Sequence, residues 1–194
     1  MKASATCVTF IDAIVSRRGL LRDVALVVGF ACLTALCAQI SFWIGPVPVS
    51  GQTFAVLLTG ALLGSRRGAL SQLSYLAIGS TGIPLWFAFG GAPGIARLIG
   101  PTGGYLFGFV VAAFVVGWLA ERGWDRHVWT AIVVMLAGSV AIYLFGLSWL
   151  SLFVPKGMVL QAGFYPFIIG DVAKILLAAL LLPSGWLLLR RFAH

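Results

Sequence analysis

The sequence predicts an all-α integral membrane protein with six transmembrane helices, some of them short or irregular. Of its 194 residues, 61% are hydrophobic and 9% are charged, whereas soluble domains average about 45–50% apolar and about 25% charged residues. The mean hydropathy is +1.06. Six apolar segments follow one another, and the Lys and Arg residues concentrate in alternate connections between them.

Four of the six segments approach the length that crosses a bilayer, which is ~20 residues for a ~30 Å hydrocarbon core. They are residues 24–44, 104–120, 128–151 and 168–189. The second and third segments, 53–64 and 68–83, are shorter. We therefore do not expect these two to cross as straight helices that face lipid on all sides.

Two Gly- and Pro-rich stretches interrupt this pattern, "GPVPVSGQ" at 45–52 and a longer stretch at 79–104. Irregular backbone at membrane depth persists only where protein covers it or where it lines a cavity. Each stretch is therefore a candidate pocket lining, with a surface loop as the alternative.

The basic residues predict the orientation, because short basic loops stay on the cytoplasmic side. Two of the thirteen lie in loops on one side, Arg97 and Lys156. Ten lie on the other side: Lys2, Arg17, Arg18, Arg22, Arg66, Arg67, Arg122, Arg126, Arg190 and Arg191. This predicts that both termini are cytoplasmic, with residues 1–20 as a cytoplasmic tail and 21–194 as the six-helix membrane domain.

The remaining basic residue, Lys174, lies inside the last apolar segment, "FIIGDVAKILLAALLL". A lysine at the centre of a spanning helix costs about 2.5–3.5 kcal/mol on insertion scales. Asp171 precedes it by three residues, so both side chains leave the same helical face. The pair is a candidate ligand contact, and an anchoring ion pair is the alternative.

Arg97 lies in a loop that is otherwise uncharged, "GGAPGIARLIGPTGGY". It is a candidate contact for an anion, with a lipid headgroup as the alternative. Thr102 stands where it could cap the following helix. The exposed N–H groups of that turn could also bind a carboxylate.

The sequence lacks the residue patterns that nucleotide binding, metal binding, catalysis and nucleic-acid binding require. The sequence contains no G-x-x-x-x-G-K-[ST] loop for nucleotide phosphates. Its cysteines and histidines have no metal-ligand spacing, no Ser or Cys has an evident base, and the basic residues do not form a surface for nucleic acid. We therefore predict no catalytic centre, no metal site, no cofactor and no nucleic-acid partner. The residues concerned are Cys7, Cys32, Cys37, His127 and His194.

Three stretches taken together resemble the BioY family, the biotin-binding S components of energy-coupling factor (ECF) transporters. They are "GPVPVSGQTFAVLLTGALLGSRRGALSQLSYLAIGSTGIPLW", "LIGPTGGYLFGFVVAAFVVGWLAERG" and "FYPFIIGDVAK". The resemblance covers about residues 24–122 and 162–183. It implies a multi-pass protein of the bacterial inner membrane that binds biotin in an outward-facing pocket. It also implies docking onto a transmembrane coupling protein and ATPase subunits.

The resemblance assigns roles to individual residues. Asp171 and Lys174 match the G-D-x-x-K pair that contacts the biotin head, and Arg97 matches a loop arginine near the ligand. Gln52 belongs to the Q-T-F-A-V-L motif and joins them as a ligand-binding candidate. Ala31 and Ala35 match the small-residue face with which these components contact the coupling protein.

The chemistry of biotin agrees with these residues. Its ureido ring offers N–H donors to Asp171 and a carbonyl to Lys174. Its apolar bicycle suits aromatic side chains, and its carboxylate suits the side chain of Arg97 and the turn at Thr102. The aromatic candidates are Trp86, Phe87 and Tyr105. Three alternatives remain: an S component for another vitamin, a membrane-embedded enzyme that uses Cys32 or Cys37, and a structural protein without a ligand.

Overall fold

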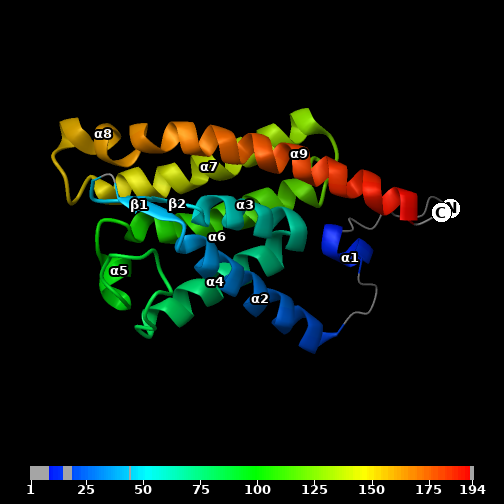
Figure 1. The fold of residues 1–194 in the computed structure, drawn as a ribbon, viewed down its shortest axis with the longest axis horizontal. Helices are drawn as coiled ribbons and strands as arrows, with labels where there is room; N and C mark the ends of the chain where they lie inside the picture. Colours follow the sequence, from blue (N-terminus) through cyan, green and yellow to red (C-terminus); the bar gives the residue numbers. More distant parts are fainter. Residues whose placement is uncertain (1–8, 15–18, 44, 193–194) are drawn as a thin grey trace.

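The computed structural model describes residues 9–14, 19–43 and 45–192, and these residues form a mostly helical bundle (Figure 1). Short 3-10 turns at Lys156–Met158 and Tyr165–Phe167 flank α8. A small antiparallel hairpin of β1 and β2 lies between α2 and α3. The helices are α1 (Phe10–Ile14), α2 (Leu20–Ala38), α3 (Gln52–Leu63), α4 (Ser65–Ser80), α5 (Ile95–Ile99), α6 (Gly103–Ala120), α7 (Val128–Leu150), α8 (Val159–Gly163) and α9 (Ile168–Phe192).

The six apolar segments of the sequence correspond to α2, α3, α4, α6, α7 and α9. Within the described residues, four stretches are long and apolar enough to cross a membrane: α2, α6, α7 and the stretch Lys156–Leu189 that contains α9. Helix α3 is apolar but has only 12 residues. The predicted difference between four long segments and two shorter ones is therefore present in the structure.

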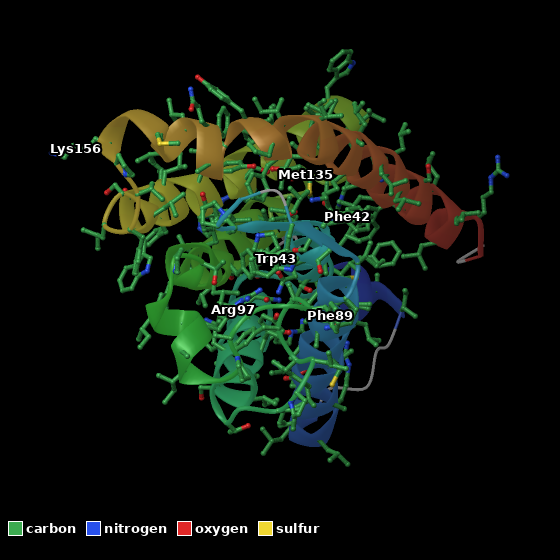
Figure 2. All side chains as sticks on the ribbon, turned by 60° about the vertical axis from the view of Figure 1, so that its left-hand side comes forward. Phe42, Trp43, Phe89, Arg97, Met135 and Lys156 are labelled. Carbon is green, nitrogen blue, oxygen red and sulfur yellow. The ribbon has the colours of Figure 1, made fainter. Side chains whose placement is uncertain are left out.

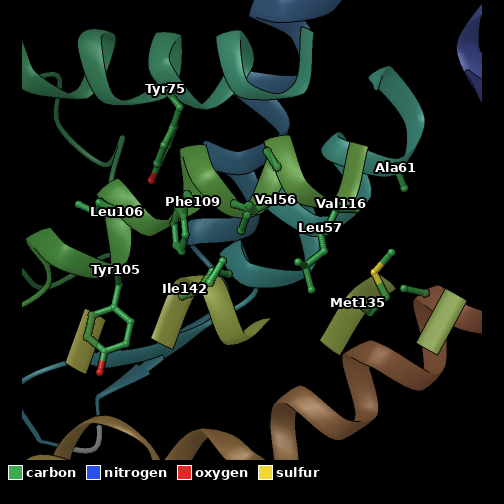
Figure 3. Close-up of a cluster of buried hydrophobic side chains, with 14 of the residues drawn as sticks. Val56, Leu57, Ala61, Tyr75, Tyr105, Leu106, Phe109, Val116, Met135 and Ile142 are labelled. Carbon is green, nitrogen blue, oxygen red and sulfur yellow. The ribbon is translucent and has the colours of Figure 1, made fainter. Parts of the chain in front are cut away.

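Helix α6 forms the centre of the bundle and packs against α3, α4 and α7. Close approach is possible because glycines occupy the helix crossings. A Cβ atom at Gly60 would lie 2.5 Å from the Ala113 carbonyl oxygen, and one at Gly108 would lie 3.0 Å from the Ile142 Cα. The core between these helices is close-packed and is shown in Figure 3. Its members include Val56, Leu57, Phe109, Val116, Met135 and Ile142.

The first long helix ends earlier than the sequence suggested. The predicted segment continued to residue 44, but α2 ends at Ala38. The following residues form β1 (Ser41–Trp43), which pairs with β2 (Pro48–Ser50). The expectation of a helix here was wrong because this pairing satisfies the backbone groups of the chain that follows α2. The structure is thus not purely α-helical.

The side chain of Gln39 connects the end of α2 to the loop after α4. Its amide nitrogen donates to the carbonyl oxygens of Leu85 and Phe87. The hairpin makes a second connection to the same loop, from the Trp43 indole to the Phe89 carbonyl at 2.6 Å. The hairpin and the loop therefore form one layer over the end of the bundle.

The predicted N-terminal tail is described in part, since residues 1–8 and 15–18 lie outside the described ranges. The described part includes α1, which packs on the bundle. Asp12 pairs with Arg22 of α2 at 3.0 Å and also with Arg67 of α4. Phe10 meets Trp186 of α9 edge to face, with ring centroids 5.4 Å apart. Helix α1 thus contacts α2, α3, α4 and α9.

The two ends of the bundle differ in charge. We call one the arginine-rich end, where α2 begins and α9 finishes. Its described arginine side chains are Arg22, Arg66, Arg67, Arg122, Arg126 and Arg191. The opposite end carries the hairpin, α5 and α8 (Figure 1), and we call it the pocket end.

Candidate ligand-binding site

A cavity lies inside the pocket end of the bundle and holds about 490 Å³ of empty space, its open mouth included. Its walls combine apolar and aromatic surface with a few polar groups. They come from β2, α3, α5, α6 and α7, and from the turn before α9. The lining residues are Val47, Pro48, Ser50, Gln52, Thr53, Arg97, Thr102, Tyr105, Leu106, Phe109, Ile142, Tyr143 and Phe167.

Asp171 and Lys174 lie directly behind one wall of this cavity. The Lys174 ammonium is 3.2 Å from Asp171 Oδ1, and it also donates to the Ser50 carbonyl at 2.8 Å and to Thr53 Oγ1 at 2.9 Å. An ammonium group has three N–H donors, so all of them are used within the protein. The pair is half-buried to buried, and neither member lines the cavity.

Two hydroxyl groups stand between this ion pair and the cavity. Tyr143 of α7 donates its hydroxyl hydrogen to Asp171 Oδ2. Thr53 of α3 accepts from Lys174 and lies 3.5 Å from Asp171 Oδ1. Both residues line the cavity, and sequence reasoning did not identify either. Tyr143 could have been noticed in the sequence, because its hydroxyl group lies within the apolar segment 128–151.

Gln52 extends the same polar wall away from the ion pair. Its Oε1 accepts from the Ser50 hydroxyl at 2.8 Å, and its Nε2 donates to the hydroxyl of Tyr75. Tyr75 is fully buried and its hydroxyl also contacts the Trp86 carbonyl at 3.4 Å. Gln52 lines the cavity and is held by partners on both sides.

Arg97 forms part of another wall of the cavity. Its side chain is 5% exposed, lies over the Trp43 ring at 5.2 Å (Figure 2), and donates to the Ala88 carbonyl at 3.3 Å. Among the described residues, no carboxylate pairs with it. Burial lowers the pKa of the guanidinium, because charge is disfavoured away from water. An anion in the cavity would supply the missing partner.

A glycine provides the space that Arg97 needs. A Cβ atom at Gly91 would overlap the Arg97 guanidinium. The loop before α5 therefore passes close to the charged group, while its carbonyl at Ala88 binds it. Phe89, next in this loop, is exposed on the outside (Figure 2).

Thr102 and Tyr105 line the cavity, but their polar groups are already bound. Thr102 stands at the N-cap position of α6 without capping it. Its hydroxyl donates to the Arg97 carbonyl at 3.2 Å instead, so the expected cap was wrong. The Tyr105 hydroxyl donates to the Gly163 carbonyl at 2.8 Å, and its ring stacks on Phe167. Tyr105 therefore offers mainly its ring to the cavity.

Trp86 and Phe87 lie away from the cavity. Both pack on Tyr75, Trp86 with stacked rings 6.0 Å apart and Phe87 edge to face at 5.3 Å. The Trp86 indole also donates to the Tyr75 carbonyl at 2.8 Å. These two side chains hold the loop after α4 against that helix, and the structure does not bring them to the site.

The small residues of α2 also differ in position from the expectation. Ala31 is fully buried and Ala35 is 8% exposed. Helix α2 packs against α4 and α3, and small side chains allow such close approach. The two alanines therefore face the bundle's own helices in this conformation. Cys32 and Cys37 are free thiols on the same helix, and neither lines the cavity.

Comparison with known proteins places this geometry in a family. The model of the BioY family matches residues 3–191. A probable biotin transporter BioY of Pyrococcus horikoshii is 41% identical over 160 residues, covering 82% of this chain and 93% of the relative. The biotin transporter BioY of Thermotoga maritima is 39% identical over 153 residues, covering 78% and 88%.

A solved structure supports the same grouping. The crystal structure of the S component for biotin from an ECF-type ABC transporter superposes with a TM-score of 0.72 at 25% sequence identity. The match covers 84% of this chain and 90% of that one. By its sequence and by its arrangement of helices, the chain belongs to the BioY family.

Proposed function

We propose that this chain is the biotin-binding S component of an ECF importer and that it binds biotin in the cavity at the pocket end. One observation carries the assignment. Two hydroxyl groups, of Thr53 and Tyr143, form one wall of the cavity, which we call the hydroxyl wall, and the Asp171–Lys174 ion pair lies behind it. Arg97, which is buried and has no carboxylate partner among the described residues, forms part of another wall. These two features suit a ligand with a polar head and an anionic tail, and the names of the relatives favour biotin.

The head of biotin is assigned to the wall formed by Thr53 and Tyr143. The Tyr143 hydroxyl gives its hydrogen to Asp171, which leaves its oxygen lone pairs available to a ureido N–H. The negative charge of Asp171 behind it strengthens the hydroxyl as an acceptor. Asp171 or Lys174 could contact biotin directly only by giving up one of its present hydrogen bonds within the protein. In this proposal the pair supports the hydroxyls and supplies the charge.

The tail of biotin is assigned to Arg97. A guanidinium binds a carboxylate through two parallel N–H donors, which adds direction to the charge attraction. The apolar middle of the ligand would lie against the rings of Tyr105, Phe109 and Phe167, which also line the cavity.

The arrangement in the membrane belongs to the same proposal. Six helices, α2, α3, α4, α6, α7 and α9, form the membrane domain at 21–194, with residues 1–20 before it. The arginine-rich end faces the cytoplasm by the positive-inside rule, so both termini are cytoplasmic in the inner membrane and the cavity opens outward. A coupling transmembrane protein and ATPase subunits supply the energy. Ala31 and Ala35 become available to the coupling protein only if α2 separates from α4.

Isothermal titration of the purified full chain with biotin, thiamine and riboflavin tests the proposal. We expect heat of binding with biotin alone. Binding of thiamine or riboflavin in place of biotin would favour an S component for another vitamin. An enzyme that depends on a thiol is tested by replacing Cys32 and Cys37 with Ala, which should leave biotin binding intact.

A further inference from the structure

We propose that a membrane phospholipid binds in a groove at the arginine-rich end, between the first half of α2 and the start of α4. The groove holds about 1610 Å³ of empty space, its open side included, which exceeds the volume of the biotin cavity. Six Leu and Val side chains line it, together with nine polar or charged residues. It lies at the opposite end of the bundle from the cavity and shares no lining residue with it.

The groove exists because only the second half of α2 packs on the bundle. The buried residues of α2 all lie between Ala31 and Ala38. Its first half stands away from α4 (Figure 1), and Val24 and Val28 are 50% and 41% exposed. On the facing side, Leu70 of α4 is 52% exposed. These three side chains line the groove at the level of the membrane-spanning helices.

An apolar groove that opens toward the bilayer is filled by an acyl chain, because an empty space would forfeit the dispersion contacts of its walls. Water has few partners beside the six Leu and Val side chains, because their surfaces are hydrocarbon. The chemistry of the walls therefore selects the hydrocarbon part of a lipid.

Three arginines and three carboxylates line the groove, and the Glu121 carboxylate accepts hydrogen bonds from Ser65. The phosphate is therefore assigned through the one arginine that has no carboxylate partner among the described residues. Arg22 and Arg67 are held by Asp12 and Asp23 in ion pairs of α1, α2 and α4. Arg66 lines the groove, is exposed, and forms no ion pair with the described residues. Basic side chains between transmembrane helices at the membrane surface commonly bind lipid headgroups. The phosphate is therefore assigned to Arg66, in the cytoplasmic leaflet if the proposed orientation holds.

Lipid rebinding to the delipidated full chain, followed by native mass spectrometry, tests this site. The probes are phosphatidylglycerol, phosphatidylethanolamine and diacylglycerol, the last of which lacks the phosphate. We expect one phospholipid to bind above the background and diacylglycerol to bind at least tenfold more weakly. Arg66→Gln should weaken phospholipid binding roughly tenfold, as for the loss of one charged hydrogen-bond partner. The matched control is Arg122→Gln, at the same end but stacked on Trp118.

A second pair of variants tests the groove without touching a charge. Leu70→Trp places a large ring in the groove and should abolish rebinding of the phospholipid. Leu73→Trp is the control, because Leu73 is 49% exposed on the same helix and does not line the groove. Three results would overturn the proposal. They are equal phospholipid binding by all four variants, equal binding of diacylglycerol and phospholipid, and no lipid binding by the full chain. Biotin titration of the same samples separates this result from the proposed function, since no variant touches the cavity.

Discussion

Lys174 and Asp171 form an ion pair behind the cavity wall, and neither side chain lines the cavity. Their mutual attraction is supplemented by Ser50, Thr53 and Tyr143, so the hydrogen-bonding groups of the pair are occupied. This satisfaction offsets part of the cost of placing a lysine in an apolar helix. It also fixes the two hydroxyl groups that line the cavity. The pair therefore has a structural role, and in the proposed function it also supports recognition of the ligand.

Replacing Asp171 with Asn should weaken biotin binding by about 1.5–3 kcal/mol, the range for losing a charged hydrogen-bond partner. The amide keeps the size of the side chain but removes the charge that orients Lys174 and Tyr143. Isothermal titration measures the change. Asp23→Asn is the control, because Asp23 lies at the arginine-rich end with a side chain 48% exposed. Unchanged affinity in Asp171→Asn would contradict the site assignment.

Tyr143→Phe tests the hydroxyl wall separately from the ion pair. It removes one donor to Asp171 and one acceptor for the ligand, and the cavity keeps its shape. We expect biotin affinity to fall at least tenfold, because the loss involves a charged partner. Tyr165→Phe is the matched control, since that ring is 54% exposed and does not line the cavity. Equal affinities of the two variants would show that Tyr143 does not contact the ligand.

At the scale of elements, hydrophobic length and charge asymmetry predicted the helices well. The six apolar segments became α2, α3, α4, α6, α7 and α9, each within a few residues except at the end of α2. The hairpin after α2 was missed because the pairing of Ser41–Trp43 with Pro48–Ser50 depends on a turn that carries no helical or strand period. The packing of α1 was missed because it rests on contacts of Asp12 and Phe10 with distant helices.

The crossing of α3 and α6 depends on Gly60. Gly60→Ala places a methyl group 2.5 Å from the Ala113 carbonyl oxygen, and neither backbone can retreat within a close-packed core. We expect a loss of about 1–3 kcal/mol in stability, measured as a lower thermal midpoint in detergent. Gly29→Ala is the control, because a Cβ there meets no atom within 4 Å. Its midpoint should stay the same or rise slightly. Equal loss in both variants would exclude this packing explanation.

At the scale of the whole molecule, the site is assembled from segments far apart in the chain. Its lining residues come from the segments 47–53, 97–109 and 142–143 and from Phe167, and Asp171 and Lys174 stand behind them. The sequence pointed to an ion pair and a loop arginine, and the structure places Arg97 in the cavity lining and the ion pair behind it. It did not identify Thr53 and Tyr143, because their position at the cavity depends on their hydrogen bonds to Lys174 and Asp171 of α9. Trp86 and Phe87 were predicted to lie at the site because the sequence does not show that their side chains pack on Tyr75 instead.

The central claim is that one cavity binds the ureido head at its hydroxyl wall and the carboxylate at Arg97. The most direct test is equilibrium binding of biotin and of biotin methyl ester to the full chain and to Arg97→Gln. The account predicts that the full chain binds biotin more tightly than the ester by about 1.5–3 kcal/mol and that Arg97→Gln binds both equally. Absence of biotin binding, or an unchanged preference for biotin in Arg97→Gln, would contradict it.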